Sequence, residues 1–133
     1  MTHRAPESLA TILIEDSVEI RENLVAALAE LADARVIAVA ETAAEALAVF
    51  EAHAETWQLA IVDLFLKQGH GLDVLRAAAR TRSNQRIFLV TNYATPDIRQ
   101  RAMEAGADAV FDKSTELDKL FAACQALTAL RLT

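Results

Sequence analysis

The stretch TILIEDS, residues 11–17, decides the fold, because it joins three features in a fixed order. A short apolar run rich in β-branched residues comes first, and two carboxylates, Glu15 and Asp16, follow it directly. A helical pattern comes next, in which apolar residues recur at spacings of four, four and three and are expected to face the core: Ile20, Leu24, Leu28 and Leu31. The stretch predicts a buried strand that ends in acidic residues and leads at once into a helix.

The same order of strand and helix returns four more times along the chain. Short apolar runs predict four further strands at residues 36–40, 59–62, 87–90 and 109–111. Helical patterns predict four further helices at residues 42–52, at 72–80, from Pro96 to just before Gly106, and from about Ser114 onward. Five strands therefore alternate with five helices.

Apolar and polar spacing also predicts how two of these helices are oriented. In the helix at 42–52, Leu47 and Phe50 are expected to face inward. Thr115 and Asp118 form a possible capping box at the start of the last helix. The inward stripe of that helix is expected to comprise five residues: Leu117, Leu120, Phe121, Cys124 and Leu127.

Strands that alternate with helices predict an α/β fold, in which helices cover both faces of a parallel sheet. The strands are continuous apolar runs, as strands buried on both faces are. We expect the flavodoxin-like, doubly wound strand order 2-1-3-4-5. No internal repeat or linker interrupts the pattern, so residues 1–133 are interpreted as one domain with a core at about 11–131 and no output domain.

The composition excludes several classes of protein. A chain of 133 residues is long enough to bury a hydrophobic core without the help of disulfides or a structural metal. A single cysteine excludes a disulfide framework and a Cys-rich zinc site. The 13 Lys and Arg against 19 Asp and Glu give a net charge of −6, which argues against nucleic acid as a partner. No signal peptide and no membrane-spanning apolar run is found, so we expect a cytoplasmic protein.

Polar residues follow four of the five predicted strands. Glu15 and Asp16 follow the first strand, Asp63 the third, Thr91 the fourth and Lys113 the fifth. The carboxyl ends of parallel strands share one edge, and ligands bind there at the point where the strand order reverses, between strands one and three. Three crowded carboxylates raise one another's pKa unless a cation lies among them. The cluster predicts a site for Mg²⁺, with Mn²⁺ as the alternative.

A divalent ion beside a carboxylate, a hydroxyl and an ammonium favours phosphoryl transfer, which depends on positioning and charge neutralisation. In this interpretation Asp63 attacks phosphorus and forms an acyl phosphate. Asp16 and Asp63 bind the metal directly, and Glu15 binds it through a water molecule. Lys113 supplies a compact positive charge to one phosphoryl oxygen, and the Thr91 hydroxyl donates to another.

Four segments, taken in order, resemble the receiver domains of two-component response regulators: ILIEDS at 12–17, IVDLFL at 61–66, LVTNYA at 89–94 and GADAVFDKS at 106–114. The resemblance implies that Asp63 takes a phosphoryl group from a phosphohistidine on a histidine kinase or a histidine phosphotransfer protein. It implies that the backbone carbonyl of Phe65 is a metal ligand. It also implies that phosphorylation draws in the Thr91 hydroxyl and reshapes the face made by the fourth helix, fifth strand and fifth helix, which then controls a downstream protein target.

The chain departs from the family pattern at three positions. Val110 stands where the family usually has Tyr or Phe, and strand alternation points the neighbouring Phe111 to the other face of the sheet. Ser114 replaces the proline that normally follows the lysine, so we expect a trans peptide bond there. Asn92 replaces a small residue and narrows the access to Asp63. We expect Tyr93 to carry part of the switch and the phosphoryl group to be lost slowly.

Several interpretations stay open. The favoured one is a stand-alone receiver that acts as a relay, a phosphate sink or a messenger, and as a monomer or weak homodimer, without being a conventional enzyme. A receiver-like binding module that works without phosphorylation is an alternative. A Mg²⁺-dependent hydrolase with an aspartate nucleophile is a weaker one, because such enzymes need a second Asp where this chain has Phe65. The chain could also be a piece of a longer regulator.

Overall fold

All five predicted strands and all five predicted helices are present in the computed structural model, which describes residues 8–78 and 84–131. The strands form one parallel sheet in the order β2-β1-β3-β4-β5. They are β1 (Leu9–Ile14), β2 (Ala34–Ala40), β3 (Leu59–Val62), β4 (Arg86–Thr91) and β5 (Ala109–Asp112). The helices are α1 (Val18–Ala32), α2 (Ala43–Ala52), α3 (Gly71–Ala77), α4 (Pro96–Glu104) and α5 (Leu117–Arg131).

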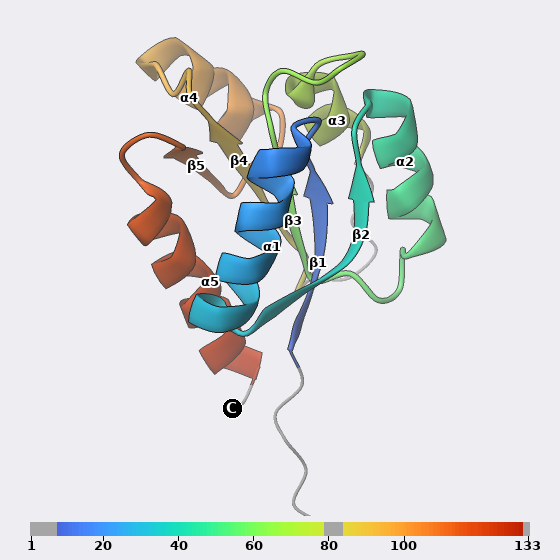
Figure 1. Ribbon diagram of the computed structural model, residues 1–133. Helices are drawn as coiled ribbons and strands as arrows, with labels where there is room; N and C mark the ends of the chain where they lie inside the picture. The colour runs from blue at the N-terminus through green and yellow to red at the C-terminus, as the bar shows by residue number, and fades with distance from the viewer. Residues whose placement is uncertain (1–7, 79–83, 132–133) are drawn as a thin grey trace, which may run out of the picture.

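Helices cover both faces of the sheet, α1 and α5 on one face and α2, α3 and α4 on the other (Figure 1). Successive strand residues alternate between the two cores, because side chains point to opposite faces along a strand. Ile12 and Ile14 pack beneath α2, α3 and α4, whereas Leu13 packs beneath α1 and α5. Val110 and Phe111 separate in the same way, as predicted. The flavodoxin-like fold class is confirmed.

One residue of the predicted α1 stripe faces outward. Leu24 and Leu28 are buried, and Ile20 packs against the same core. Leu31 is 49% exposed, and Ala32 is buried in its place. The buried stripe therefore continues at a spacing of four, and the last turn ends on a small residue whose carbonyl accepts a hydrogen bond from Thr128 of α5.

Two other details of the helices differ from the prediction, and a third agrees with it. In α2 the inward residues are Ala46 and Phe50, while Leu47 is 41% exposed because it lies about 100° around the helix from Ala46. Helix α3 ends at Ala77, and residue 80, the predicted end, lies outside the described residues. The predicted stripe of α5 is confirmed, with Leu120 and Cys124 buried and the other three packed against them.

The start of α5 is also later than predicted. The helix begins at Leu117, and the capping box of Thr115 with Asp118 is wrong, since Thr115 lies ahead of the cap. The intervening turn is made by Asp112, whose side chain accepts the Ser114 N–H at 2.7 Å and whose carbonyl accepts the Glu116 N–H at 2.8 Å. Residues 114–116, which the pattern had assigned to the helix, therefore belong to this turn.

Parallel strands bring all five carboxyl ends to a single edge of the sheet, the upper edge in Figure 1. The loops from β1 to α1, from β3 to α3, from β4 to α4 and from β5 to α5 meet there. Within the described part of the chain, no helix has both the length and the apolar character needed to cross a bilayer.

Candidate functional site

A cavity of about 420 Å³ opens at the carboxyl edge of the sheet. It is lined by every residue that the sequence predicted for the site: Glu15, Asp16, Asp63, Phe65, Thr91 and Lys113. Asn92, one of the departures from the family pattern, and Tyr93, which is expected to carry part of the switch, also line it. The strand ends have therefore brought together residues from four separate segments of the chain, as the strand order requires.

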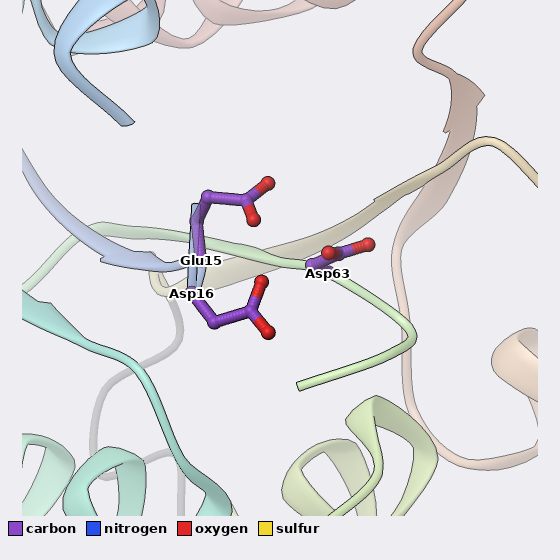
Figure 2. A group of neighbouring side chains, drawn as sticks. All are labelled: Glu15, Asp16 and Asp63. Atoms are coloured by element: carbon purple, nitrogen blue, oxygen red, sulfur yellow. The ribbon is translucent and has the colours of Figure 1, made fainter. Parts of the chain in front are cut away.

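Three carboxylates form the acidic side of the cavity. Glu15 and Asp16 extend from the end of β1 toward Asp63 at the end of β3 (Figure 2). One oxygen from each of the three lies within 4.8 Å of the others. Hard divalent cations bind oxygen ligands, so these residues can hold Mg²⁺ with several of its waters retained.

The Lys113 ammonium balances part of this negative charge. Its Nζ lies 2.6 Å from Glu15 Oε1 and 3.1 Å from Asp63 Oδ2. The second Glu15 oxygen accepts the Ser17 N–H at 3.1 Å, and Asp63 Oδ1 accepts the Leu64 N–H at 2.8 Å. Lys113 thus faces two carboxylates at once, whereas the sequence predicted only its contact with a phosphoryl oxygen.

Burial and crowding shift the protonation of these groups. Burial raises the pKa of Asp63 from 3.8 to about 6; Lys113 opposes this rise and Glu15 adds to it. Burial also raises the pKa of Asp16, and the hydrogen bond and charge of Glu15 act in the same direction. Burial pulls the pKa of Lys113 down, but Glu15 and Asp63 outweigh it and raise that pKa above its ordinary value. A cation among the carboxylates would relieve this repulsion.

Asp63 is held in place by a close approach of the backbone. The Asp63 N–H donates to the Ile14 carbonyl at 3.0 Å, and the Gly71 N–H donates to the Leu64 carbonyl at 2.6 Å. A Cβ atom at Gly71 would overlap the carbonyl oxygen of Asp63. Gly69 has a φ of 91°, a backbone conformation that glycine adopts without strain. The two glycines therefore let α3 start directly beside Asp63.

Thr91 lies at the end of β4 and is fully buried at the base of the cavity. Its hydroxyl oxygen accepts the Tyr93 N–H at 3.1 Å, and its carbonyl accepts the Lys113 N–H at 3.0 Å. The backbone of the β4–α4 loop is thereby tied to the start of the β5–α5 loop, next to the hydroxyl and the ammonium that are predicted to contact a phosphoryl group.

An aromatic rim of Phe65, His70 and Tyr93 borders the opening. The Phe65 ring meets Tyr93 edge-to-face at a centroid distance of 5.0 Å and meets His70 at 5.5 Å. Phe65 is 51% exposed and Tyr93 is 57% exposed. Such contacts add modestly to stability and restrict both loops. His70 is the N-cap of α3, and its Nδ1 accepts the Leu72 N–H at 3.2 Å.

Two of the departures from the family pattern contact each other. The Ser114 hydroxyl donates to the side-chain oxygen of Asn92 at 3.1 Å, next to Lys113. Each residue was noted separately in the sequence, but their separation by 22 positions hid the contact. All peptide bonds of the described residues are trans, as expected at Ser114. Whether the Phe65 carbonyl binds a metal stays a prediction.

One charged residue near the site was missed by the sequence analysis. Arg99 of α4 bonds backbone carbonyls and Glu116 across the neighbouring loops. An arginine in a largely polar surface helix looks like a solvated residue, and no spacing rule points to backbone acceptors that lie 5 and 11 positions away.

Comparisons with known proteins agree on one family. The family model described as the response regulator receiver domain matches residues 11–125. The acid tolerance regulatory protein ActR of Rhizobium meliloti is 31% identical over 120 residues, which cover 89% of this chain and 58% of ActR. The chain thus spans somewhat more than half the length of that relative.

Solved structures show the same fold. The signal receiver domain of the response regulator NarL from Mycobacterium tuberculosis aligns with a TM-score of 0.80 at 23% identity, over 93% of this chain and 98% of that one. A response regulator from Burkholderia pseudomallei, solved with a phosphorylated aspartic acid, a calcium ion and citrate, aligns with a TM-score of 0.73 at 25% identity, over 90% of this chain and 68% of that one.

Proposed function

Since the chain belongs to the response regulator receiver domains of two-component systems, we propose that its Asp63 carboxylate accepts a phosphoryl group with the help of a divalent cation. One observation carries this assignment. Asp63 follows β3, which lies between β1 with its acidic end and β4 with Thr91, and Asp63 Oδ2 is 3.1 Å from Lys113 Nζ. Glu15 also contacts Lys113, at 2.6 Å, but its side chain is only 2% exposed, against 12% for Asp63. Asp63 therefore lies between the expected anion contact and the expected cation contact.

The transfer needs little from the protein beyond positioning and charge. An Asp63 oxygen attacks phosphorus, the bond from phosphorus to the donor atom breaks, and the donor leaves with the electron pair of that bond. The product is an acyl phosphate on Asp63. The Lys113 ammonium, which its raised pKa keeps protonated, stabilises one phosphoryl oxygen, and the Thr91 hydroxyl donates to another.

The acidic side of the cavity suits Mg²⁺, or Mn²⁺ in its place. Asp16 and Asp63 would bind the ion directly, Glu15 through water, and the Phe65 backbone carbonyl would complete the protein ligands. Bound there, the ion supplies positive charge that neutralises the carboxylates and the incoming phosphoryl oxygens. The response regulator from Burkholderia pseudomallei, which was solved with a phosphorylated aspartic acid and a calcium ion, supports this arrangement.

The biological donor is proposed to be a phosphohistidine on a histidine kinase or a histidine phosphotransfer protein. The phosphoryl group then changes the face formed by α4, β5 and α5, which controls a protein target or passes the phosphoryl group on. In this proposal residues 1–133 act as one receiver domain, a signalling switch rather than a conventional enzyme.

The proposal is tested by incubating the protein with Mg²⁺ and acetyl phosphate and measuring the intact mass. We expect one added phosphoryl group, which is absent in an Asp63→Asn variant and in a sample treated with a chelator. An Asp97→Asn variant is the matched control, because Asp97 lies on the surface of α4, and it should be modified like the wild type. A wild type left unmodified by both acetyl phosphate and a phosphorylated histidine phosphotransfer domain would overturn the proposal.

A further inference from the structure

A guanidinium on α4 connects the β4–α4 loop to β5 and to the β5–α5 loop. Arg99 Nε donates to the Ala94 carbonyl at 3.0 Å, in the loop that follows Thr91. Its Nη1 donates to the Val110 carbonyl of β5 at 3.1 Å. Its Nη2 lies 2.6 Å from Glu116 Oε1, at the end of the loop that carries Lys113. One side chain thus holds three acceptors on three segments, as the planar fork of arginine allows.

The Glu116 carboxylate extends this connection to the backbone beside Lys113. The oxygen that accepts from Arg99 also accepts the Asp112 N–H at 2.9 Å. Its other oxygen lies 3.3 Å from Lys119 Nζ. The hydrogen bond from Arg99, followed by the one from Asp112, lowers the pKa of Glu116 to about 2, so this carboxylate is ionised at neutral pH.

These bonds are made close to the functional groups but outside the cavity. Asp112 pairs with Thr91 in the ladder between β4 and β5, and Lys113 follows Asp112 directly. Ala94 follows Thr91 by three positions. Any movement of the β4–α4 loop relative to the β5–α5 loop must therefore stretch or break a bond to Arg99.

We propose that Arg99 is a positioning residue for phosphoryl transfer, which fixes the separation between the Thr91 hydroxyl and the Lys113 ammonium across from Asp63. This inference rests on the proposed function, because it assumes that both groups contact a phosphoryl group. Moving such a group by about 1 Å is enough to reduce transfer strongly.

A surface ion pair on the same helix gives the contrast. Arg101 lies 3.1 Å from Asp97, and both side chains are well exposed, at 60% and 69%. Exposed pairs of this kind contribute little. In the other pair, Arg99 is 39% exposed and Glu116 only 18%. Arg99 also donates to two backbone carbonyls, in addition to its ion pair. Arg101→Gln is therefore the matched control for a change at Arg99.

The test separates binding of a phosphoryl mimic from binding of the metal. Beryllofluoride, bound to Asp63 in the presence of Mg²⁺, requires Thr91 and Lys113 in position, whereas Mg²⁺ alone requires only the acidic residues. We expect Arg99→Gln to weaken beryllofluoride binding and slow phosphorylation by acetyl phosphate about tenfold, with Mg²⁺ affinity unchanged. Arg99→Lys should fail to restore either, since one ammonium cannot replace the fork. Glu116→Gln should show a smaller loss.

The outcomes distinguish the inference from the proposed function. If the wild type and the Arg99→Gln variant bind beryllofluoride equally well, the inference about Arg99 is overturned and the proposed function stands. Equal losses of Mg²⁺ and beryllofluoride affinity in Arg99→Gln, or full rescue by Arg99→Lys, would overturn it too, because they indicate general destabilisation or a charge effect. A wild type that binds Mg²⁺ but neither takes a phosphoryl group nor binds beryllofluoride would overturn both.

Discussion

Replacing Asp63 with Asn should stabilise the metal-free protein at neutral pH. Burial raises the Asp63 pKa from 3.8 to about 6, so the native state binds this proton more tightly than the unfolded chain does. Stability then falls as the pH rises through the interval between the two values, and the loss persists at higher pH. Asn is neutral at every pH and has nearly the same shape, so the variant does not undergo this loss.

The size of the effect follows from the two pKa values. At pH 7.5 the full interval of about 2 pH units applies, and the variant should gain about 3 kcal/mol in free energy of unfolding. At pH 5 the native carboxyl is mostly protonated while the unfolded one is mostly ionised, and the gain should shrink to about half of that at pH 7.5. The advantage should disappear below the ordinary pKa of 3.8.

Urea denaturation in the presence of a chelator measures these differences directly. Asp97→Asn serves as the control and should stay within about 0.5 kcal/mol of the wild type at both pH values. Adding Mg²⁺ should stabilise the wild type more than the Asp63→Asn variant, because the variant loses a ligand. An Asp63→Asn variant that is no more stable than the wild type at pH 7.5, or whose gain does not change with pH, would refute the reasoning.

Three other predictions follow from the site. Gly71→Ala should lower the free energy of unfolding in urea by about 1–3 kcal/mol, because its Cβ would overlap the Asp63 carbonyl oxygen; an unchanged value would contradict that packing. Mg²⁺ affinity, measured by calorimetry, should fall as the pH drops below about 6, since Asp63 must release its proton to bind; a flat profile from pH 7.5 to 5 would be inconsistent with the raised pKa. Phe65→Ala should speed the loss of the phosphoryl group, measured by intact mass over time, because the aromatic rim limits the access of water. Tyr93→Ala should speed this loss as well, and it should also weaken phosphorylation-dependent partner binding. Unchanged decay in both variants would contradict a role of the rim in limiting water, and unchanged binding by Tyr93→Ala would contradict a role of Tyr93 in the switch.

Much of the site was predictable because its reactive residue types each stand directly after a predicted strand. Asp63, Thr91 and Lys113 each follow a recognisable apolar run, and a parallel sheet places all such ends at one edge. The fold therefore determines which of these residues meet, even though up to 98 positions separate them, as between Glu15 and Lys113. Strand ends are robust predictions of this kind, because each apolar run stops where the polar residue begins.

The features that were not predicted depend on side-chain packing. The choice between Leu31 and Ala32 at the end of α1 is decided by the neighbouring α5, which a helical pattern does not describe. The start of α5 is decided by hydrogen bonds of Asp112 in the preceding turn. The contacts of Arg99 involve backbone carbonyls, which carry no signal in the sequence.

The proposed function depends most directly on which carboxylate is phosphorylated. Treating the protein with acetyl phosphate and Mg²⁺, trapping the acyl phosphate with borohydride, and mapping the peptides by mass spectrometry identifies that residue. We predict that a single residue, Asp63, is converted to homoserine, and that the conversion is lost when Mg²⁺ is chelated. Conversion of Asp16 or Glu15 instead, or conversion of Asp63 that does not depend on the metal, would contradict the account.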